Sequence, residues 1–156
     1  MSKEKKLFII DGMALIYRSH FAMIKTPLTT KNGQHTSAIY GLANSIFKLI
    51  KDEGPDYLVI AMDCKEPTFR HKMYDAYKAN REAMPDELVS QLSLIDEMLC
   101  GMNIPVLKKP GFEADDIMGT MGVVAESQGI VTYLVSGDKD LMQLVTDKVK
   151  LYTPGS

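Results

Sequence analysis

Three short apolar runs in this chain each lead into an aspartate, and this repeated pattern constrains the fold more than any other feature. The runs are 7–10, 57–62 and 131–135, and the aspartates are Asp11, Asp63 and, after a Ser-Gly turn, Asp138. Short bounded apolar runs are typical of buried strands. In an open α/β sheet, ligands bind beyond the carboxyl ends of the strands. The pattern therefore predicts that these aspartates lie together at one edge of a sheet.

Helical periodicity fills the segments between the runs. Residues 36–53 carry apolar side chains at helical spacing, and Gly54-Pro55 ends that segment. Further helices are predicted at 14–21, from Pro85 onward, at 113–128 and at 139–144, with further strands at 105–107 and 149–152. We expect Leu88, Leu92, Ile95 and Leu99 to form the buried stripe of one helix, and Ile117, Met121 and Val124 that of another. Alternating strands and helices predict a three-layer α/β/α domain with a mostly parallel sheet of about five strands.

Composition sets wide limits on the class of protein. The 156 residues fit one domain, residues 1–156, with 46% hydrophobic and 24% charged residues and a net charge of −2. No apolar stretch approaches the roughly 18 residues of a membrane span, and the charged N-terminus lacks a signal peptide's apolar region. Cys64 and Cys100 are too few for a disulfide framework, so we expect a reduced, cytoplasmic setting.

Four further acids extend the aspartate pattern: Glu113, Asp115 and Asp116 at the start of a predicted helix, and Asp140 two residues after Asp138. Each acid by itself is compatible with a turn or with a helix N-terminus, where negative charge is favourable. Their joint placement at one sheet edge favours a metal site, because clustered carboxylates repel one another unless a cation lies among them. Mg²⁺ prefers such oxygen ligands, and two ions roughly 4 Å apart can promote phosphodiester hydrolysis. At helical spacing, Glu113 and Asp116 would share one side and Asp115 would project elsewhere.

A cationic stretch with interleaved tyrosines follows Asp63. It contains Lys65, Arg70, Lys72, Tyr74, Tyr77, Lys78 and Arg81. Such a stretch suits phosphate contact combined with base stacking, although its charge alone is more often that of a solvated surface loop. No phosphate-binding glycine loop, dinucleotide fingerprint or nucleophile elbow is present, and His20, His35 and His71 lack zinc-ligand spacing.

Taken together, these strings resemble the N-terminal 5′-nuclease domain of bacterial DNA polymerase I, which belongs to the flap-endonuclease superfamily. The strings that carry the resemblance are Ile10-Asp11-Gly12, Tyr17-Arg18, Tyr40-Gly41, Asp63-Cys64-Lys65, Thr68-Phe69-Arg70, Tyr77-Lys78-Ala79-Asn80-Arg81, Met84-Pro85-Asp86, Gly111-Phe112-Glu113-Ala114-Asp115-Asp116 and Ser136-Gly137-Asp138-Lys139-Asp140-Leu141-Met142-Gln143-Leu144. They run from about residue 7 to residue 152. The Glu-Ala-Asp-Asp and Gly-Asp-Lys-Asp strings are the most specific.

The resemblance implies a PIN-like fold and a metal-dependent 5′-3′ exonuclease or flap endonuclease. Two Mg²⁺ ions, with Mn²⁺ as a substitute, would serve the complete domain. The expected partners are DNA with a 5′ flap, nick or 5′ end, and an RNA primer paired with DNA. The resemblance also implies a monomeric enzyme that associates with the nucleoid and not with a membrane. A stand-alone exonuclease, a DNA-binding chain without turnover and a small toxin-like ribonuclease are the alternatives.

Residue roles follow from the resemblance by position. One ion would lie among Asp11, Asp63, Glu113 and Asp115, and the second would be held by Asp138 and Asp140 with Asp115 between the two sites. Asp116 resembles a ligand that acts through water. Lys78, Arg81 and Arg70 resemble residues that contact the phosphate, with Tyr77 on the terminal base and Lys72 and Arg18 as further DNA contacts. The family pattern continues with two more aspartates and a helix-hairpin segment, so we expect the second site to be incomplete here and cleavage by this chain alone to be weak or absent.

Overall fold

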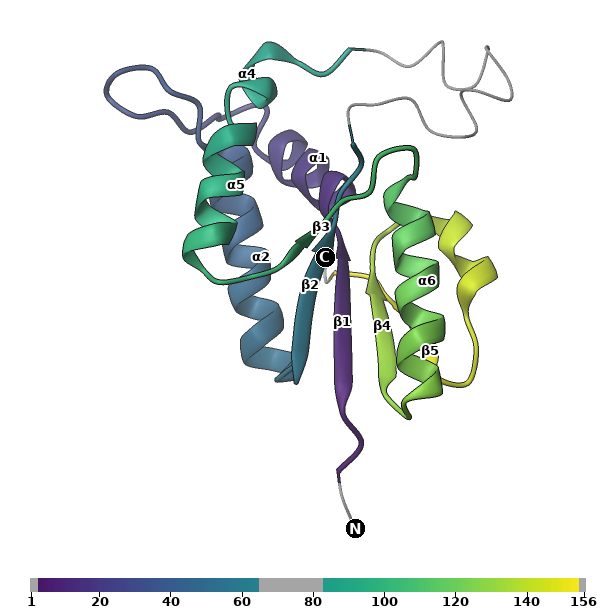
Figure 1. Ribbon diagram of the computed structural model, residues 1–156. Coiled ribbons are helices and arrows are strands. Elements are labelled where there is room, and N and C mark those ends of the chain that lie inside the picture. Colours follow the sequence, from purple (N-terminus) through teal and green to yellow (C-terminus); the bar gives the residue numbers. More distant parts are fainter. Residues whose placement is uncertain (1–2, 65–82, 155–156) are drawn as a thin grey trace.

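The computed structural model describes residues 3–64 and 83–154 and has an α/β architecture (Figure 1). In chain order the elements are β1 (Lys6–Asp11), α1 (Gly12–Ala22), α2 (Ser37–Glu53), β2 (Tyr57–Ala61), α4 (Asp86–Val89), α5 (Leu92–Gly101), β3 (Val106–Leu107), α6 (Ala114–Ser127), β4 (Val131–Val135), the 3₁₀ helix η1 (Lys139–Leu144) and β5 (Val149–Tyr152). The five strands form one sheet in the order β3-β2-β1-β4-β5, and all of their pairings are parallel. The predicted fold class is confirmed.

Side chains of β1 alternate between two hydrophobic cores, one on each face of the sheet. Phe8 and Ile10 pack with apolar residues of α1, α2 and α5, whereas Leu7 and Ile9 pack with those of α6 and η1. Figure 1 shows α1, α2 and α5 on one side of the sheet and α6 on the other. A strand that is buried on both faces must be apolar at every position, which explains why the run 7–10 shows no alternation.

The strand order places a topological switch point beside β1. The chain moves outward from β1 to β2 and β3, and then returns through α6 to β4 and β5 on the other flank. Connections after β1 and β4 therefore leave toward opposite faces, and the space beyond their carboxyl ends is the expected ligand position of such a sheet.

Two local expectations are wrong. The helix predicted from Pro85 is divided into α4 and α5, because the fully buried Gln91 accepts hydrogen bonds from the N–H groups of Ala38 and Ile39 at 2.9 and 3.2 Å. Gln91 thus satisfies the N-terminus of α2, whose own cap residue makes no side-chain hydrogen bond. Val124 is 45% exposed rather than inward, since α6 packs through Ala114, Met118, Gly122 and Ala125.

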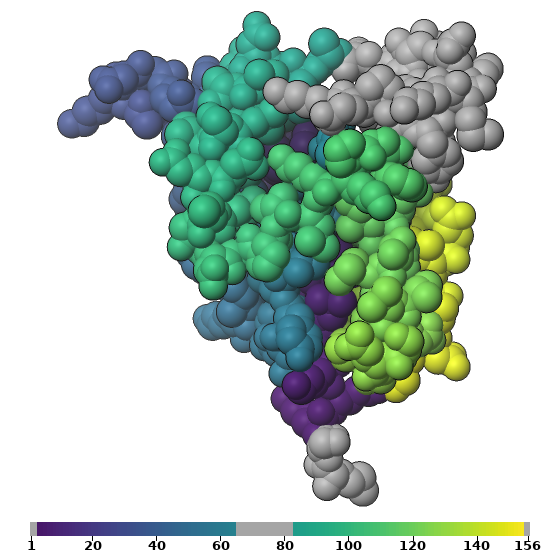
Figure 2. Space-filling view, in the orientation of Figure 1, coloured from purple at the N-terminus to yellow at the C-terminus, as the bar shows by residue number. Residues whose placement is uncertain are grey.

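The surface between α5 and α6 is crossed by the green segment that joins β3 to α6 (Figure 2). Among the described residues, 3–64 and 83–154, no helix has the length and apolar character needed to cross a membrane.

The close packing of α1 on α2 generates a test of the fold. A Cβ placed on Gly41 would lie 2.6 Å from the Cβ of the buried Ser19, whereas a Cβ on Gly101 would meet nothing within 4 Å. Ala raises helix propensity over Gly by about 1 kcal/mol, but overpacking typically costs about 1–3 kcal/mol. We expect Gly41→Ala to lower the melting temperature by about 2–4 °C and Gly101→Ala to leave it equal or higher. Equal stability of the two variants in a thermal melt would contradict the packing argument.

Candidate metal centre

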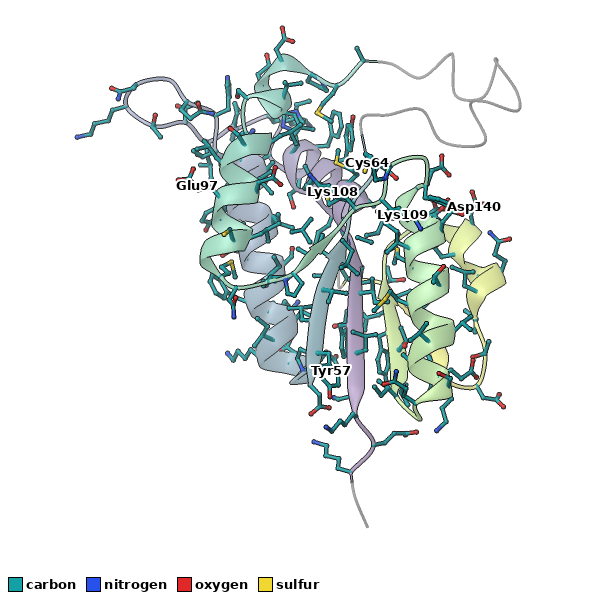
Figure 3. The ribbon with its side chains drawn as sticks, viewed as in Figure 1. Tyr57, Cys64, Glu97, Lys108, Lys109 and Asp140 are labelled. Atoms are coloured by element: carbon teal, nitrogen blue, oxygen red, sulfur yellow. The ribbon has the colours of Figure 1, made fainter. Side chains whose placement is uncertain are left out.

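Five carboxylates line one cavity of about 240 Å³ at the carboxyl edge of the sheet. They are Asp11 at the end of β1, Asp63 after β2, Glu113 and Asp115 at the start of α6, and Asp138 after β4. Met13, Ala14 and Tyr17 of α1 line the same cavity. The structure thus brings together five of the seven predicted carboxylates from four separate parts of the chain. Figure 3 shows Cys64 at this edge, next to Asp63 in sequence, with Tyr57 at the opposite end of β2.

Asp11 is held between its own helix and β4. It is only 8% exposed, and as the N-cap of α1 its Oδ1 accepts the Ala14 N–H at 3.4 Å. Its Oδ2 accepts a hydrogen bond from the buried hydroxyl of Ser136 at 3.1 Å. The Ser136 oxygen in turn accepts the N–H of Asp138 at 3.1 Å, and Asp138 Oδ1 accepts the N–H of Asp140 at 2.9 Å. One hydroxyl therefore fixes Asp11 relative to the turn that carries Asp138.

Asp63 and Glu113 meet at the N-terminus of α6. Asp63 Oδ1 accepts the N–H of Ala114, the first residue of α6, at 2.7 Å. Glu113 is the N-cap of this helix, and Asp116 Oδ2 accepts the Glu113 N–H at 2.9 Å, which completes a capping box. Asp116 therefore stabilises the start of the helix.

The helical spacing rule fails at this terminus. Glu113 has extended backbone angles, φ −91° and ψ 164°, and lies outside the helix proper. As a result, Glu113 and Asp115 share the carboxylate cavity, whereas Asp116 does not line it. The expectation that Asp115 would project elsewhere is wrong.

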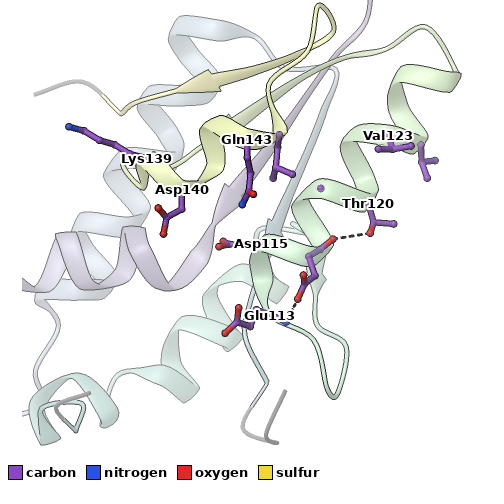
Figure 4. A pocket seen from close by; sticks show the side chains of 11 residues that line it. Glu113, Asp115, Thr120, Val123, Lys139, Asp140 and Gln143 are labelled. Atoms are coloured by element: carbon purple, nitrogen blue, oxygen red, sulfur yellow. Dashed lines mark hydrogen bonds between the residues drawn. The ribbon is translucent and has the colours of Figure 1, made fainter. Parts of the chain in front are cut away.

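A second cavity of about 1000 Å³ lies between α6 and η1 and adjoins the first. Glu113 and Asp115 line both cavities. Asp116 and Asp140 line the cavity between α6 and η1 but not the smaller one. In Figure 4, Asp115 and Asp140 face the same space, whereas Lys139 points away from them. The two cavities thus divide the seven carboxylates into overlapping groups, with Glu113 and Asp115 common to both.

Burial and mutual repulsion raise two of the pKa values in this site. Burial, followed by the charges of Asp11, Asp138, Glu113 and Asp63, raises the pKa of Asp115 to about 6. Burial also raises the pKa of Asp11, although the hydrogen bonds from Ser136 and Ala14 oppose that shift. A nearby cation would reverse both effects, because it favours the charged carboxylates.

The donor set fits a hydrated hard cation. Across the described part of the chain, no group of three or more His, Cys, Asp or Glu side chains is arranged so that it could hold a metal ion directly. The carboxylates instead surround a cavity of about 240 Å³, and a water molecule takes roughly 30 Å³ of liquid. Mg²⁺ usually keeps several waters and takes only one or two carboxylates as direct ligands. Oxygen donors around a space of this size suit that mode of binding.

The other predicted site residues lie elsewhere. Arg18 is exposed on α1 and donates a hydrogen bond from Nη1 to the Pro154 carbonyl at 3.0 Å. Arg70, Lys72, Tyr77, Lys78 and Arg81 lie outside the described residues. Cys64 and Cys100 are free thiols, in agreement with the sequence prediction.

Two residues of the site were missed by the sequence analysis. Ser136 was assigned only to a turn, and Tyr17 received no role. The Ser-Gly pair before Asp138 contained the relevant signal, because a hydroxyl immediately after a parallel strand lies at the same edge as the aspartates. Tyr17 follows Met13 by four residues and Ala14 by three, and this helical spacing places all three on the same side of α1.

The raised pKa of Asp115 predicts a pH-dependent stability in the metal-free protein. The folded pKa of about 6 exceeds the unfolded value of about 3.9, so the stabilising contribution is complete below about pH 4 and is lost as pH rises through about 6. In EDTA at pH 7.5 we expect Asp115→Asn to melt at a higher temperature than the wild type. Thermal melts between pH 4 and pH 7.5 should show this difference shrinking as the pH falls.

The exposed helical residue Asp96 supplies the control for this experiment. Asp96→Asn removes one carboxylate far from the cavity, and its effect should be small at every pH. If Asp115→Asn is no more stable than Asp96→Asn at pH 7.5, the electrostatic description of the cavity is wrong.

Comparison with known proteins agrees with this architecture. Residues 6–156 match the family described as the 5'-3' exonuclease, N-terminal resolvase-like domain. The chain is 40% identical to DNA polymerase I of Treponema pallidum over 97% of this chain and 15% of that protein. It is 39% identical to DNA polymerase I of Bacillus subtilis over 99% of this chain and 19% of that protein. The chain thus spans less than a fifth of the length of these relatives.

Solved structures share the fold at lower sequence identity. The T5 D15 protein co-crystallised with metal ions has a TM-score of 0.73 at 23% identity, covering 96% of this chain and 55% of that one. The catalytic core of Rad2 in complex with a DNA substrate has a TM-score of 0.56 at 19% identity, covering 96% of this chain and 44% of that one. The family match over nearly the whole sequence identifies the chain as a member of the 5'-3' exonuclease N-terminal, resolvase-like domain family.

Proposed function

We propose that this chain hydrolyses phosphodiester bonds at the 5′ ends and flaps of DNA with the aid of divalent cations. The observation that carries the proposal is the cavity at the carboxyl edge, where five carboxylates gather in a chain of the exonuclease family. Carboxylates that gather in one half-buried cavity repel one another, and divalent cations among them are the simplest way to relieve that repulsion.

The proposed ligands fall into two groups. Asp11, Asp63, Glu113 and Asp115 would surround one hydrated ion, with one or two of them as direct ligands and the others acting through water. Asp138 and Asp140 would hold a second, with Asp115 between the two sites. The two adjoining cavities agree with this division at Asp115, which lines both, and at Asp140, which lines only the larger one. Asp138 lines only the smaller cavity, so it would reach the second ion from the border between the two. Mg²⁺ is the proposed ion, with Mn²⁺ as a substitute, because every donor is an oxygen.

Bound divalent cations would supply a water activated near neutral pH and stabilisation of the leaving oxygen. The residues of the chain would position this chemistry. Ser136 and the Ala14 N–H orient the two oxygens of Asp11. The Ala114 N–H orients Asp63. Because these partners are already in place, little reorganisation is needed when substrate binds.

Relatives and neighbours supply the proposed substrate class. The closely matched relatives are DNA polymerase I proteins, and the T5 D15 flap endonuclease has been solved with DNA and metal ions. We extend DNA flaps, nicks and 5′ ends to this chain as substrates, and an RNA primer paired with DNA as a further one. Lys78, Arg81 and Arg70 are proposed to offset the charge of the scissile phosphate, with Tyr77, Lys72 and Arg18 as further contacts, and the protein is proposed to act as a cytoplasmic monomer.

Cleavage of a 5′-labelled flap duplex tests the proposal. With Mg²⁺ we expect product that EDTA abolishes and that Asp11→Asn reduces by roughly a hundredfold or more, because a preorganised electrostatic contact is lost. Asp96→Asn, which removes an exposed carboxylate on α5, should retain wild-type rates. Lys78→Ala should lower the rate while the Mg²⁺ concentration at half-maximal rate stays unchanged.

Two results would contradict the proposed function. The first is cleavage that persists in EDTA and in Asp11→Asn, since it would come from a contaminant or from another site. The second is the absence of cleavage of flap, nicked and 5′-ended DNA with both Mg²⁺ and Mn²⁺, which would leave DNA binding without turnover. If Lys78→Ala cleaves at the wild-type rate, only the role of Lys78 in the mechanism is contradicted.

The Ser136 hydroxyl generates a second test. Removing a hydrogen-bond partner of a metal ligand typically costs 10–100-fold in metal affinity or activity. We expect Ser136→Ala to raise the Mn²⁺ concentration at the midpoint of a thermal-shift titration by roughly tenfold or more. Ser127→Ala removes a hydroxyl that donates only to the Val124 carbonyl on exposed α6, and its midpoint should equal that of the wild type. Identical midpoints for the two variants would show that Ser136 does not position Asp11.

A further inference from the structure

The carboxyl edge of the sheet carries cations as well as carboxylates. Leu107, the last residue of β3, pairs with Ala61 of β2, and its carbonyl accepts the Met62 N–H at 2.9 Å. Lys108 and Lys109 therefore leave the sheet at the edge where Asp63 follows β2. Figure 3 shows both lysines on this edge of the molecule together with Cys64 and Asp140. Thus β3 is followed by positive charge, whereas β1 ends in an aspartate and β2 and β4 are each followed by one.

A tight turn fixes the second lysine against an aromatic ring. The Phe112 N–H donates to the Lys109 carbonyl at 3.1 Å, and Gly111 has φ +85°. Proline and then glycine with positive φ are the residues of a type II turn. Within this turn the Lys109 Nζ lies 5.0 Å from the centroid of the Phe112 ring, a cation–π contact, and Phe112 is 38% exposed.

These residues border a groove of about 360 Å³, here called the Lys–Phe groove. Its lining combines Lys108, Lys109 and Phe112 with apolar Val106, Leu107 and Ile117. Asp116 and Thr120 line both this groove and the larger carboxylate cavity, so the two spaces are neighbours across the start of α6. The Asp116 carboxylate accepts the Glu113 N–H, which offsets part of its negative charge toward the groove.

We propose that the Lys–Phe groove binds one nucleotide of a single strand, with its phosphate against Lys108 and Lys109 and its base on the exposed part of Phe112. Lysines supply salt-sensitive phosphate contact, and an aromatic ring beside them supplies sequence-independent stacking. A paired duplex hides its base faces, so an apolar and aromatic lining favours an unpaired strand. This proposal rests on the proposed function, because the groove would serve to hold the strand beside the carboxylates.

Binding measured without metal tests the groove separately from cleavage. Fluorescence anisotropy in EDTA would follow a labelled ten-nucleotide oligothymidine and an abasic strand of equal length. We expect Lys108→Ala/Lys109→Ala to weaken binding of both strands and to reduce the slope of log Kd against log[salt] by about 0.7, the value for one phosphate of a single strand. The matched pair Lys51→Ala/Lys150→Ala removes two exposed lysines from α2 and β5, and its slope should equal the wild-type slope.

The aromatic contact requires its own variant. Phe112→Leu keeps an apolar side chain but removes the stacking face, so oligothymidine should bind about 5–150-fold more weakly while the abasic strand is unaffected. Gly111→Ala places a Cβ where φ is +85°, which should loosen the turn. Binding of both strands should therefore weaken. Circular dichroism melts would establish that each variant is folded.

Each remaining outcome decides the inference. Salt slopes equal for the Lys108/Lys109 variant and its control would overturn it, as would a Phe112→Leu that affects both strands equally. Binding of a polyglutamate peptide as tight as that of oligothymidine would show a general anion surface and overturn it too. Flap cleavage with intact Mg²⁺ dependence beside any of these results would leave the proposed function standing. If the wild-type chain does not cleave flap DNA but the variants bind as expected, the proposed nucleotide-binding groove stands and the proposed nuclease function is wrong.

Discussion

Mutual repulsion among the carboxylates is the constraint on which the carboxyl edge of this protein is built. Helix N-termini in this chain offset part of that repulsion, because they favour nearby negative charge. Asp11 is the N-cap of α1, Glu113 is the N-cap of α6 and Asp138 is the N-cap of η1, while Asp63 accepts the first N–H of α6. Each N-terminus favours a nearby anion by about 0.3–1 kcal/mol, more where it is partly buried. Three helix starts directed at one edge therefore allow acids to gather there in a folded chain.

The compensation is incomplete, and this incompleteness is the chemical signature of the site. Asp115 lies within the first turn of α6, yet burial and four neighbouring carboxylates still raise its pKa to about 6. A site designed only to cap helices would not need a fifth acid in this position. In the proposed function this residual repulsion would favour binding of a cation, because a divalent ion would relieve the interactions that the helix termini leave uncompensated.

Much of this arrangement follows from the sequence because two simple rules operate together. Parallel strands end at one edge, so Asp11, Asp63 and Asp138 could be placed together from the apolar runs that precede them. The errors arise where a tertiary contact overrides a local period. Gln91 interrupts a helical pattern in order to cap α2, and α6 approaches the sheet through Gly122 and Ala125, which turns Val124 outward. Glu113 adopts extended angles as a cap, so helical spacing could not describe its neighbours. The hydrogen bond from Ser136 to Asp11 could not be predicted, because it depends on strand register: Ile10 pairs with Val135, which places the hydroxyl of the next residue beside Asp11.

The same register makes the two proposed ion sites interdependent. Asp11 is linked through Ser136 to the N–H of Asp138, and Asp138 is linked to the N–H of Asp140, so a shift of the turn after β4 moves ligands of both sites. Asp115 and Glu113 line both cavities and reinforce this coupling electrostatically. A cation in the smaller cavity lowers the negative charge that the larger cavity presents, which weakens a second cation there. It also lowers repulsion toward a phosphate. Substrate, which brings its own negative charge, would restore the second site's affinity, so the geometry favours full occupation only when a phosphodiester lies between the ions.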